Sequence, residues 1–170
     1  MGKAEFSSKK IPTNFTAKEA IDQKLPLEDE QIEVNCVSLG NPHCVILKND
    51  LNIDEIKKYG PMIEHHLMFP NKINVQFAKV LTRKEVDILI WERGAGFTLA
   101  SGSSSYTVDS SLYKKGLVDN KVKINMPGGT LTIKMDKENH VKMLGEVRQI
   151  IEGHLSKELV EDLDEYNEYL

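Results

Sequence analysis

Short apolar runs follow one another along most of the chain, each alternating with polar residues or forming a continuous apolar stretch. Turn residues such as Gly40-Asn41-Pro42 separate these runs. Period-two alternation directs one face of a strand into a core and the other away from it. Strands are therefore expected over residues 31–39, 43–47, 73–81, 85–91, 121–126, 130–135 and 141–144.

Helical spacing is confined to four segments. Helices are expected over residues 52–59, 62–68, 103–115 and 156–170, with Gly60-Pro61 ending or restarting the first of them. Residues 1–29 are polar and are interrupted by Pro12 and Pro26, so this stretch is expected to be irregular. The mixture of strands and helices predicts the α+β class.

Composition narrows the class of protein without naming a function. The 170 residues are 40% apolar and 28% charged, which is ordinary for one compact soluble domain. The net charge of −4, without a basic run, argues against nucleic-acid binding. No apolar run reaches membrane-spanning length and no hydrophobic signal region starts the chain, so no membrane association and a cytoplasmic location are expected.

The segment with the most chemistry is residues 91–106, WERGAGFTLASGSSSY. Here a charged pair, Glu92 and Arg93, precedes a glycine turn, and glycine and serines then open a helix. The start of a helix is electropositive, and small residues let an anion approach its amides closely. The segment therefore predicts a cradle for a carboxylate or phosphate. A serine-capped helix after a glycine turn, with no ligand, is the alternative.

This segment resembles the signature of the diaminopimelate epimerases, WERGxGxTxACGTG. Three further segments agree with that family in order and spacing: SLGNPHCV at residues 38–45, INVQF at residues 73–77, and the PGG that begins at Pro127. The resemblance runs from the start of the chain to about Leu155. It covers only the second of the two similar halves from which these enzymes are built.

The resemblance implies a fold and a division of the chain. It implies a mixed β-sheet barrel wrapped around a central helix, here residues 103–115, with an active site in the cleft between two halves. Residues 1–155 would form the epimerase-like C-terminal domain. Residues 156–170 would add an acidic amphipathic helix. A separate N-terminal half, or a homo-oligomer, is the expected partner.

The added helix has a stripe of Leu159, Leu163 and Tyr166 at helical spacing, and Ser156 as its N-cap. One interpretation docks this stripe on the chain's own domain. The other makes it a packing surface for a partner that replaces part of the missing half.

The family inverts an α-carbon without a cofactor, using one cysteine on each face of the substrate. Ser101 stands where the second cysteine is usual. An alcohol is a much weaker acid than a thiol and needs a neighbouring base to lose its proton. The following family positions also drift, with Ser103 and Ser104 in place of threonine and glycine. Amino-acid binding is thus expected to survive better than catalysis.

Each of the other residue roles implied by the resemblance has a purely structural alternative. His43 and Glu92 would tune the catalytic groups, and Ser101 would stand at the reacting face. The expected contacts to an amino-acid substrate come from Asn41, Asn74, Glu92, Arg93, Gly102 and Ser103. Alternatively, Asn41 caps its own turn, Asn74 makes an edge-strand or turn hydrogen bond, and Glu92 and Arg93 form a surface salt bridge.

No metal or cofactor is expected. His65 and His66 are adjacent and would point in different directions, which makes them a poor metal pair. Cys36 and Cys44 have neither disulfide nor metal spacing and are expected to be buried. Cys44 neighbours His43, but it is not expected to replace the lost thiol because Ser101 is the substrate-facing position by resemblance.

The sequence therefore predicts the C-terminal half of a cofactor-independent amino-acid epimerase or racemase, with diaminopimelate as the expected substrate and negligible activity for the chain alone. Three alternatives remain open: a racemase for another amino acid, a non-catalytic amino-acid-binding domain, and an unstable remnant of a longer enzyme. Ligand binding without proton exchange would favour the binding domain, and poorly cooperative unfolding would favour the remnant.

Overall fold

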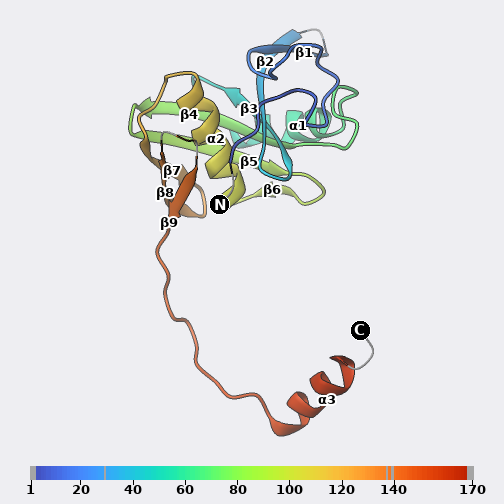
Figure 1. The fold of residues 1–170 in the computed structure, drawn as a ribbon, viewed down its shortest axis with the longest axis vertical. Helices are drawn as coiled ribbons and strands as arrows, with labels where there is room; N and C mark the ends of the chain where they lie inside the picture. Colours follow the sequence, from blue (N-terminus) through green and yellow to red (C-terminus); the bar gives the residue numbers. More distant parts are fainter. Residues whose placement is uncertain (1–2, 29, 137, 139, 168–170) are drawn as a thin grey trace.

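A computed structural model describes residues 3–28, 30–136, 138 and 140–167, the last four by their backbone alone (Figure 1). The described residues form strands and helices in the order β1 Gln23–Leu27, β2 Glu30–Ser38, β3 Pro42–Leu47, α1 Ile53–Glu64, β4 Asn74–Thr82, β5 Glu85–Glu92, β6 Gly96–Thr98, α2 Gly102–Lys114, β7 Lys121–Met126, β8 Gly129–Met135, β9 Val141–Leu144 and α3 Lys157–Asn167. The expected strands from β2 onward are present within a residue or two of the predicted bounds.

The strands form one mixed sheet that does not close into a barrel. Their order is β1-β2-β3-β4-β5-β7-β8-β9, with β6 beside β5. The pairs β3–β4 and β5–β7 are parallel, and the others are antiparallel. Lys3 makes an isolated bridge to His140, and Glu5 makes another to Ser38. The predicted closed barrel is wrong. Closure requires a continuous hydrogen-bonded ladder between the two edges of the sheet, and in the described residues these isolated bridges stand in place of such a ladder.

The sheet separates two apolar clusters, one against each long helix. On β5, Val86, Ile88 and Ile90 belong to the cluster around α2, whereas Leu89 and Trp91 belong to the cluster beside α1. This division follows the period-two alternation of the strand. Helix α2 packs against β2, β3, β4, β7, β8 and β9, so the prediction of a central helix is confirmed.

Helix α1 runs unbroken through Gly60 and Pro61, where an interruption was predicted. Asn52 caps its start by accepting from the amide of Asp54 at 2.8 Å. Pro61 lies in the last turn, where it removes one helical hydrogen-bond donor without ending the helix before Glu64. A Cβ on Gly60 would lie 2.6 Å from Cγ of Trp91, so glycine lets the indole pack directly on the helix.

Two short strands escaped prediction. In β1, Leu25 and Leu27 are buried, whereas Pro26 is exposed on this edge strand, where a missing amide costs little. The register pairs Leu25 with Ile32 of β2, so β1 forms through its partner rather than through its own pattern. The other is β6, which pairs with β5 across the glycine turn.

Beyond β9 the chain leaves the sheet. Residues 145–156 have no regular structure, and Val147 and Ile150 are 95% and 96% exposed. Helix α3 follows, away from the sheet (Figure 1), with Leu159 and Leu163 45% and 49% exposed. The structure therefore does not show this helix docked on its own domain, because Leu159 and Leu163 of its apolar stripe are exposed. The side chain of Tyr166 lies outside the described residues.

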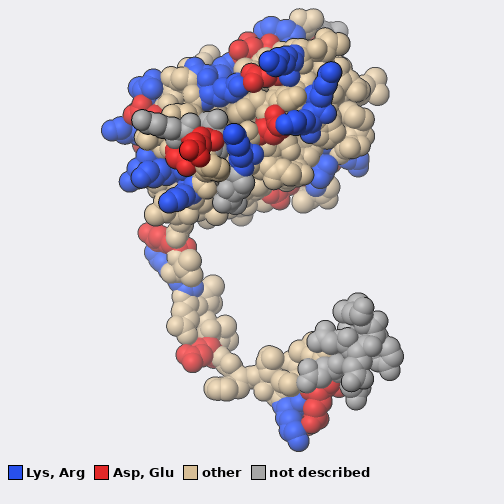
Figure 2. All heavy atoms as spheres, in the orientation of Figure 1, with Lys and Arg blue, Asp and Glu red and all other residues tan. Residues whose placement is uncertain are grey.

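Charged residues of both signs are interspersed on the sheet-bearing part in Figure 2, without a continuous basic face on that side. None of the described helices is long and apolar enough to cross a membrane.

Candidate active site

The start of α2 is held by Ser101 in a standard N-cap. Its hydroxyl accepts from the amide of Ser104 at 3.4 Å, and its carbonyl accepts from the hydroxyl of Ser105 at 2.9 Å. The amide of Ser101 donates to Sδ of Met126 at 3.4 Å, which ties the cap to β7. The first-turn amides of a helix point out of its end, and no acidic residue lies in the first turn of α2 to neutralise them.

An open pocket of about 1060 Å³ adjoins this helix end. Ala100, Ser101 and Gly102 form one wall, and the β7–β8 turn and residues from the start of the tail form the rest. The turn approaches closely because the amide of Gly128 donates to the carbonyl of Leu99 at 2.8 Å. A Cβ on Gly128 would lie only 3.0 Å from that carbonyl oxygen, which accounts for one glycine of the PGG motif.

A buried polar network reaches α2 from the sheet. Nε2 of Gln76 on β4 lies 3.0 Å from Nδ1 of His43 on β3 and donates to Oγ of Ser104 at 3.1 Å. His43 is 1% exposed, and the other two are fully buried. Burial, with a smaller contribution from the charge of Arg93, lowers the pKa of His43 to about 4, so its imidazole is neutral at pH 7.

Asn74 joins two loops at this end of the sheet. Its Nδ2 donates to the carbonyl of Pro42 at 2.9 Å, and its Oδ1 accepts from the amide of Arg93 at 3.0 Å. The guanidinium of Arg93 donates to the carbonyl of Asn71 at 2.9 Å. Asn74 thus makes the turn hydrogen bonds offered as its alternative role. Asn41 is half-buried, and its side chain has no hydrogen bond among the described residues. Substrate roles for these residues stay predictions.

The turn after β5 is supported from beneath by Glu64 of α1, which is 3% exposed. Its Oε2 accepts from the indole of Trp91 at 2.7 Å, and its Oε1 accepts from the amide of Gly94 at 2.9 Å. Gly94 has φ 77°, a conformation that favours glycine. Glu92 accepts from the hydroxyl of Thr98 at 3.3 Å, and within the described residues it forms no ion pair with Arg93.

The structure therefore brings most of the predicted residues to one end of the sheet. His43 and Asn74 are register partners, Arg93 bonds Asn74, and Ser104 links the network to the helix that Ser101 caps. Sequence reasoning missed Gln76 and Glu64. Gln76 stands two positions after Asn74 on the same strand, and that period-two spacing is the signal that would have found it.

The two cysteines do not contribute to this site. Cys36 and Cys44 are opposite each other on β2 and β3, and both are completely buried, as predicted. Burial and the neighbouring Cys36 raise the pKa of Cys44 well above its ordinary value, which keeps the thiol protonated. Among the described residues no group of three or more His, Cys, Asp or Glu is placed to hold a metal ion.

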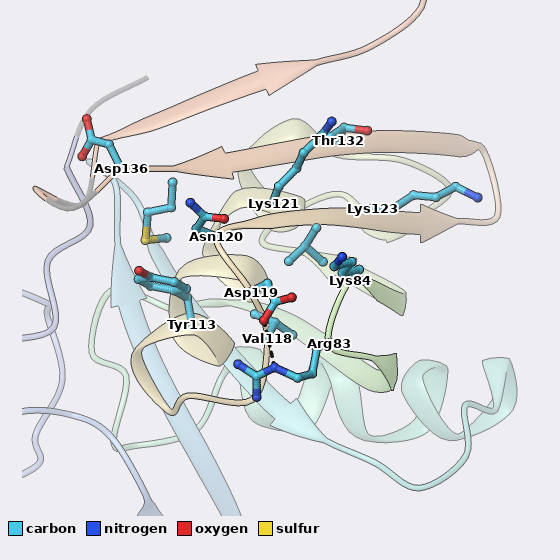
Figure 3. Close-up of a pocket in the computed structure, with 12 residues that line it drawn as sticks. Arg83, Lys84, Tyr113, Val118, Asp119, Asn120, Lys121, Lys123, Thr132 and Asp136 are labelled. Atoms are coloured by element: carbon cyan, nitrogen blue, oxygen red, sulfur yellow. Dashed lines mark hydrogen bonds and ion pairs between the residues drawn. The ribbon is translucent and has the colours of Figure 1, made fainter.

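A second pocket, of about 780 Å³, lies at the other end of α2 (Figure 3). Lys84, Lys121 and Thr132 are among its lining residues, and Arg83 donates to Asp119 there at 2.8 Å. None of the predicted site residues lines this pocket.

Comparisons with known proteins agree with the four motifs. A family model described as diaminopimelate epimerase matches residues 35–150. Diaminopimelate epimerase 2 of Nostoc sp. strain PCC 7120 is 43% identical over 159 residues, which are 94% of this chain and 56% of that protein. The diaminopimelate epimerase of Halothermothrix orenii is 35% identical over 91% of this chain and 55% of that protein. The chain thus spans just over half the length of these relatives.

Among solved structures, a hydroxyproline epimerase from Agrobacterium vitis with bound trans-4-hydroxy-L-proline superimposes with a TM-score of 0.49 at 11% identity. The superposition covers 68% of this chain and 40% of that one.

Proposed function

We propose, because this chain belongs to the diaminopimelate epimerase family, that it supplies one half of the active site of a cofactor-independent amino-acid epimerase. The expected substrate is diaminopimelate, the compound in the names of the relatives. Inversion at an α-carbon needs a base on one face and an acid on the other. The chain spans only 55–56% of two of those relatives, which supports a site completed by a second half.

One observation carries the proposal: the start of α2, capped by Ser101, adjoins an open pocket that is lined by residues of two family motifs, the 91–106 segment and the PGG turn. A substrate carboxylate would lie against the amides of Gly102 and Ser103, where the positive end of the helix favours an anion. Asn41, Asn74, Glu92 and Arg93 would bind the rest of the amino acid. A racemase for another amino acid would use the same cradle.

The isolated chain is proposed to have negligible epimerase activity. Ser101 offers an alcohol where the family has a thiol, and its hydroxyl is already engaged in capping α2. No carboxylate or imidazole is hydrogen-bonded to that hydroxyl among the described residues, and its side-chain neighbour is Oγ of Ser103 at 3.3 Å. The group that acts on the opposite face would come from the second half.

Exposed apolar residues support a missing partner. Val147, Ile150, Ile151 and Leu155 lie uncovered on residues 145–156, which begin beside the pocket. Such a concentration of exposed apolar side chains is typical of a surface that another chain covers. We propose that a separate N-terminal half, or a second copy of this chain, covers it.

The test is a titration of the purified chain with diaminopimelate in deuterated buffer, followed by NMR. The backbone amides of Gly102 and Ser103 should shift, and the α-proton signal of the ligand should stay. Ser101→Cys should behave in the same way, because the opposing group is still absent.

Two results would contradict the proposal. Loss of the α-proton signal that Ser101→Ala abolishes would show a working base in this chain alone. Absence of any amide shift, with the chain folded, would remove the carboxylate cradle. A panel of other amino acids then tests the choice of substrate.

The second candidate is a non-catalytic amino-acid-binding domain. It is favoured by one specific observation, the serine at position 101 beside an otherwise intact helix end. Both candidates predict binding by the lone chain. They differ in whether a complementing half restores proton exchange once position 101 carries a thiol.

A further inference from the structure

Among the described residues, one side chain, that of Gln76, is hydrogen-bonded to the imidazole of His43. His43 and Val45 alternate on β3, and the register places Gln76 of β4 beside Val45. From there the Gln76 carboxamide reaches diagonally to Nδ1 of His43 at 3.0 Å, while Nε2 of His43 has no hydrogen-bond partner in the part of the chain that the structure describes. Both side chains face α2 rather than α1, because the apolar neighbours Cys44 and Phe77 belong to the cluster on the α1 side.

The carboxamide nitrogen can only donate hydrogen bonds. It donates to Oγ of Ser104 and lies against Nδ1 of His43, so Nδ1 must accept with its lone pair. A neutral imidazole then carries its one proton on Nε2. We propose that Gln76 is a positioning residue that fixes His43 as the Nε2–H tautomer, so that this histidine presents a hydrogen-bond donor and not an acceptor.

Buried-group accounting favours this orientation of the carboxamide over its reverse. In the orientation described, Oε1 of Gln76 and the Nε2–H of His43 are buried and find no partner within the described residues. The reverse orientation would bury both N–H donors of the carboxamide without acceptors, and orphaned N–H groups are rarer in proteins than under-satisfied carbonyls. Burial also keeps the imidazole neutral, since it lowers the pKa of His43 to about 4.

The consequence for catalysis rests on the proposed function. A fixed N–H donor stabilises a negatively charged partner more than its neutral form and so lowers that partner's pKa. His43 would therefore favour the ionised form of an acid–base group brought within hydrogen-bond distance of its Nε2. An acceptor at the same nitrogen would do the opposite, so the residue at position 76 sets which way His43 acts.

The experiment reads the tautomer directly, by long-range proton–nitrogen NMR of the full chain at neutral pH. The His43 ring signals are assigned by their loss in His43→Asn. The unmodified chain should show the Nε2–H pattern, and this arm needs no substitution at position 76. An Nδ1–H pattern would overturn the proposal.

Gln76→Glu supplies the second arm. A carboxylate of nearly the same shape can only accept, so it should move the proton to Nδ1 or hold the imidazole doubly protonated, with its pKa raised above about 4. A folded Gln76→Glu chain that keeps the Nε2–H pattern, while the carboxyl carbon signal shows the new side chain to be ionised, would contradict the proposal. If that variant does not fold, the pattern in the unmodified chain still decides.

Two matched controls separate this role from general packing. Ser104→Ala removes the other partner of Gln76 but leaves its contact with Nδ1, so the Nε2–H pattern should persist. Gln31→Glu adds the same charge at an exposed position of β2 and should leave His43 unchanged. The tautomer is measured without substrate, so its failure is distinct from failure of the proposed function, which α-proton exchange tests.

Discussion

The two ends of α2 treat polar side chains in opposite ways. At the N-terminal end, His43, Gln76 and Ser104 are buried and bond one another without a formal charge. At the C-terminal end, charged side chains are paired at the surface: Lys114 with Glu19, Lys115 with Asp22 and Glu33, and Arg83 with Asp119.

The two ends differ in how much their polar side chains affect the stability of the fold. Exposed ion pairs contribute about 0–1 kcal/mol each because water screens them. Buried polar groups cost about 1–3 kcal/mol when left unpaired, so they are retained where geometry matters. Among the described residues, Nε2 of His43 and Oε1 of Gln76 are buried and unpaired at the N-terminal end, and so are the side chains of Asp109 and Ser111 farther along α2.

The largest expected effect comes from Asp109, which lies in the middle of α2. It is fully buried, neither carboxylate oxygen has a hydrogen-bond partner among the residues the structure describes, and burial raises its pKa to about 7 from 3.8. The folded state therefore holds this proton more tightly than the unfolded state, so stability is lost as the pH rises from about 4 to about 7. Asp109→Asn should raise the free energy of unfolding by roughly 4 kcal/mol near pH 8 and hardly at all near pH 4.

Urea unfolding at the two pH values checks this prediction. Asp119→Asn is the matched control at the exposed C-terminal end, where the effect should stay below about 1 kcal/mol at either pH. Equal stabilisation by Asp109→Asn at both pH values would show that burial of its charge is not the cause.

Glu64→Gln should lower the free energy of unfolding by about 2 kcal/mol and should disturb the structure only at the end of the sheet that carries the candidate site. An amide nitrogen cannot accept, so either the indole of Trp91 or the amide of Gly94 loses its partner. Trp91 is the sole tryptophan, and its emission should change with the substitution. Glu55→Gln on the same helix, where Lys48 is the half-exposed partner, should leave both stability and emission nearly unchanged. The same loss in both variants would contradict a special role for Glu64.

Gly60→Ala tests the close packing of α1 against the indole of Trp91. Overpacking against Trp91 costs about 1–3 kcal/mol, and the better helix propensity of alanine returns about 1 kcal/mol. A net loss of about 1 kcal/mol in thermal unfolding is expected, with altered Trp91 emission. Gly153→Ala, where a Cβ meets nothing within 4 Å, should have no effect. A stabilised Gly60→Ala chain would mean that the indole moves away freely.

The smallest effect is expected at the C-terminal end. Arg83→Ala removes the ion-pair partner of Asp119. Because the Arg83 side chain is 62% exposed, the free energy of unfolding should fall by less than about 1 kcal/mol, and by less still at high salt. The His43 tautomer and the Gly102 and Ser103 amides should not respond in NMR spectra. A change in those signals would show that the two ends of α2 are coupled and would contradict their separation in the structure.

Local pattern determined much of the fold. The strand β5 was predictable because Val86, Ile88 and Ile90 alternate within it and both faces meet apolar clusters. The strand β1 was not, because it depends on its pairing with β2. The closed barrel was wrong for a different reason: it was implied by the family resemblance and by no local pattern, since contacts between distant edges leave no mark in any single segment.

The candidate site was predictable only where a motif carried it. His43, Asn74 and Ser101 were named from family resemblance, and the structure gathers them at one end of the sheet. Gln76 and Glu64 were missed because their partners lie far away in sequence: Gln76 is 33 positions from His43, and Glu64 is 27 from Trp91. Their burial and bonding required the folded chain.

The central claim is that the N-terminal end of α2 is half of an epimerase active site. The most direct measurement is α-proton exchange into diaminopimelate by a fusion of this chain with the part of the Nostoc relative that it does not match. With Ser101→Cys the fusion should exchange the α-proton, and with Ser101 it should be slower by orders of magnitude. A folded Ser101→Cys fusion that exchanges nothing, under conditions where the intact Nostoc protein does, would contradict the claim.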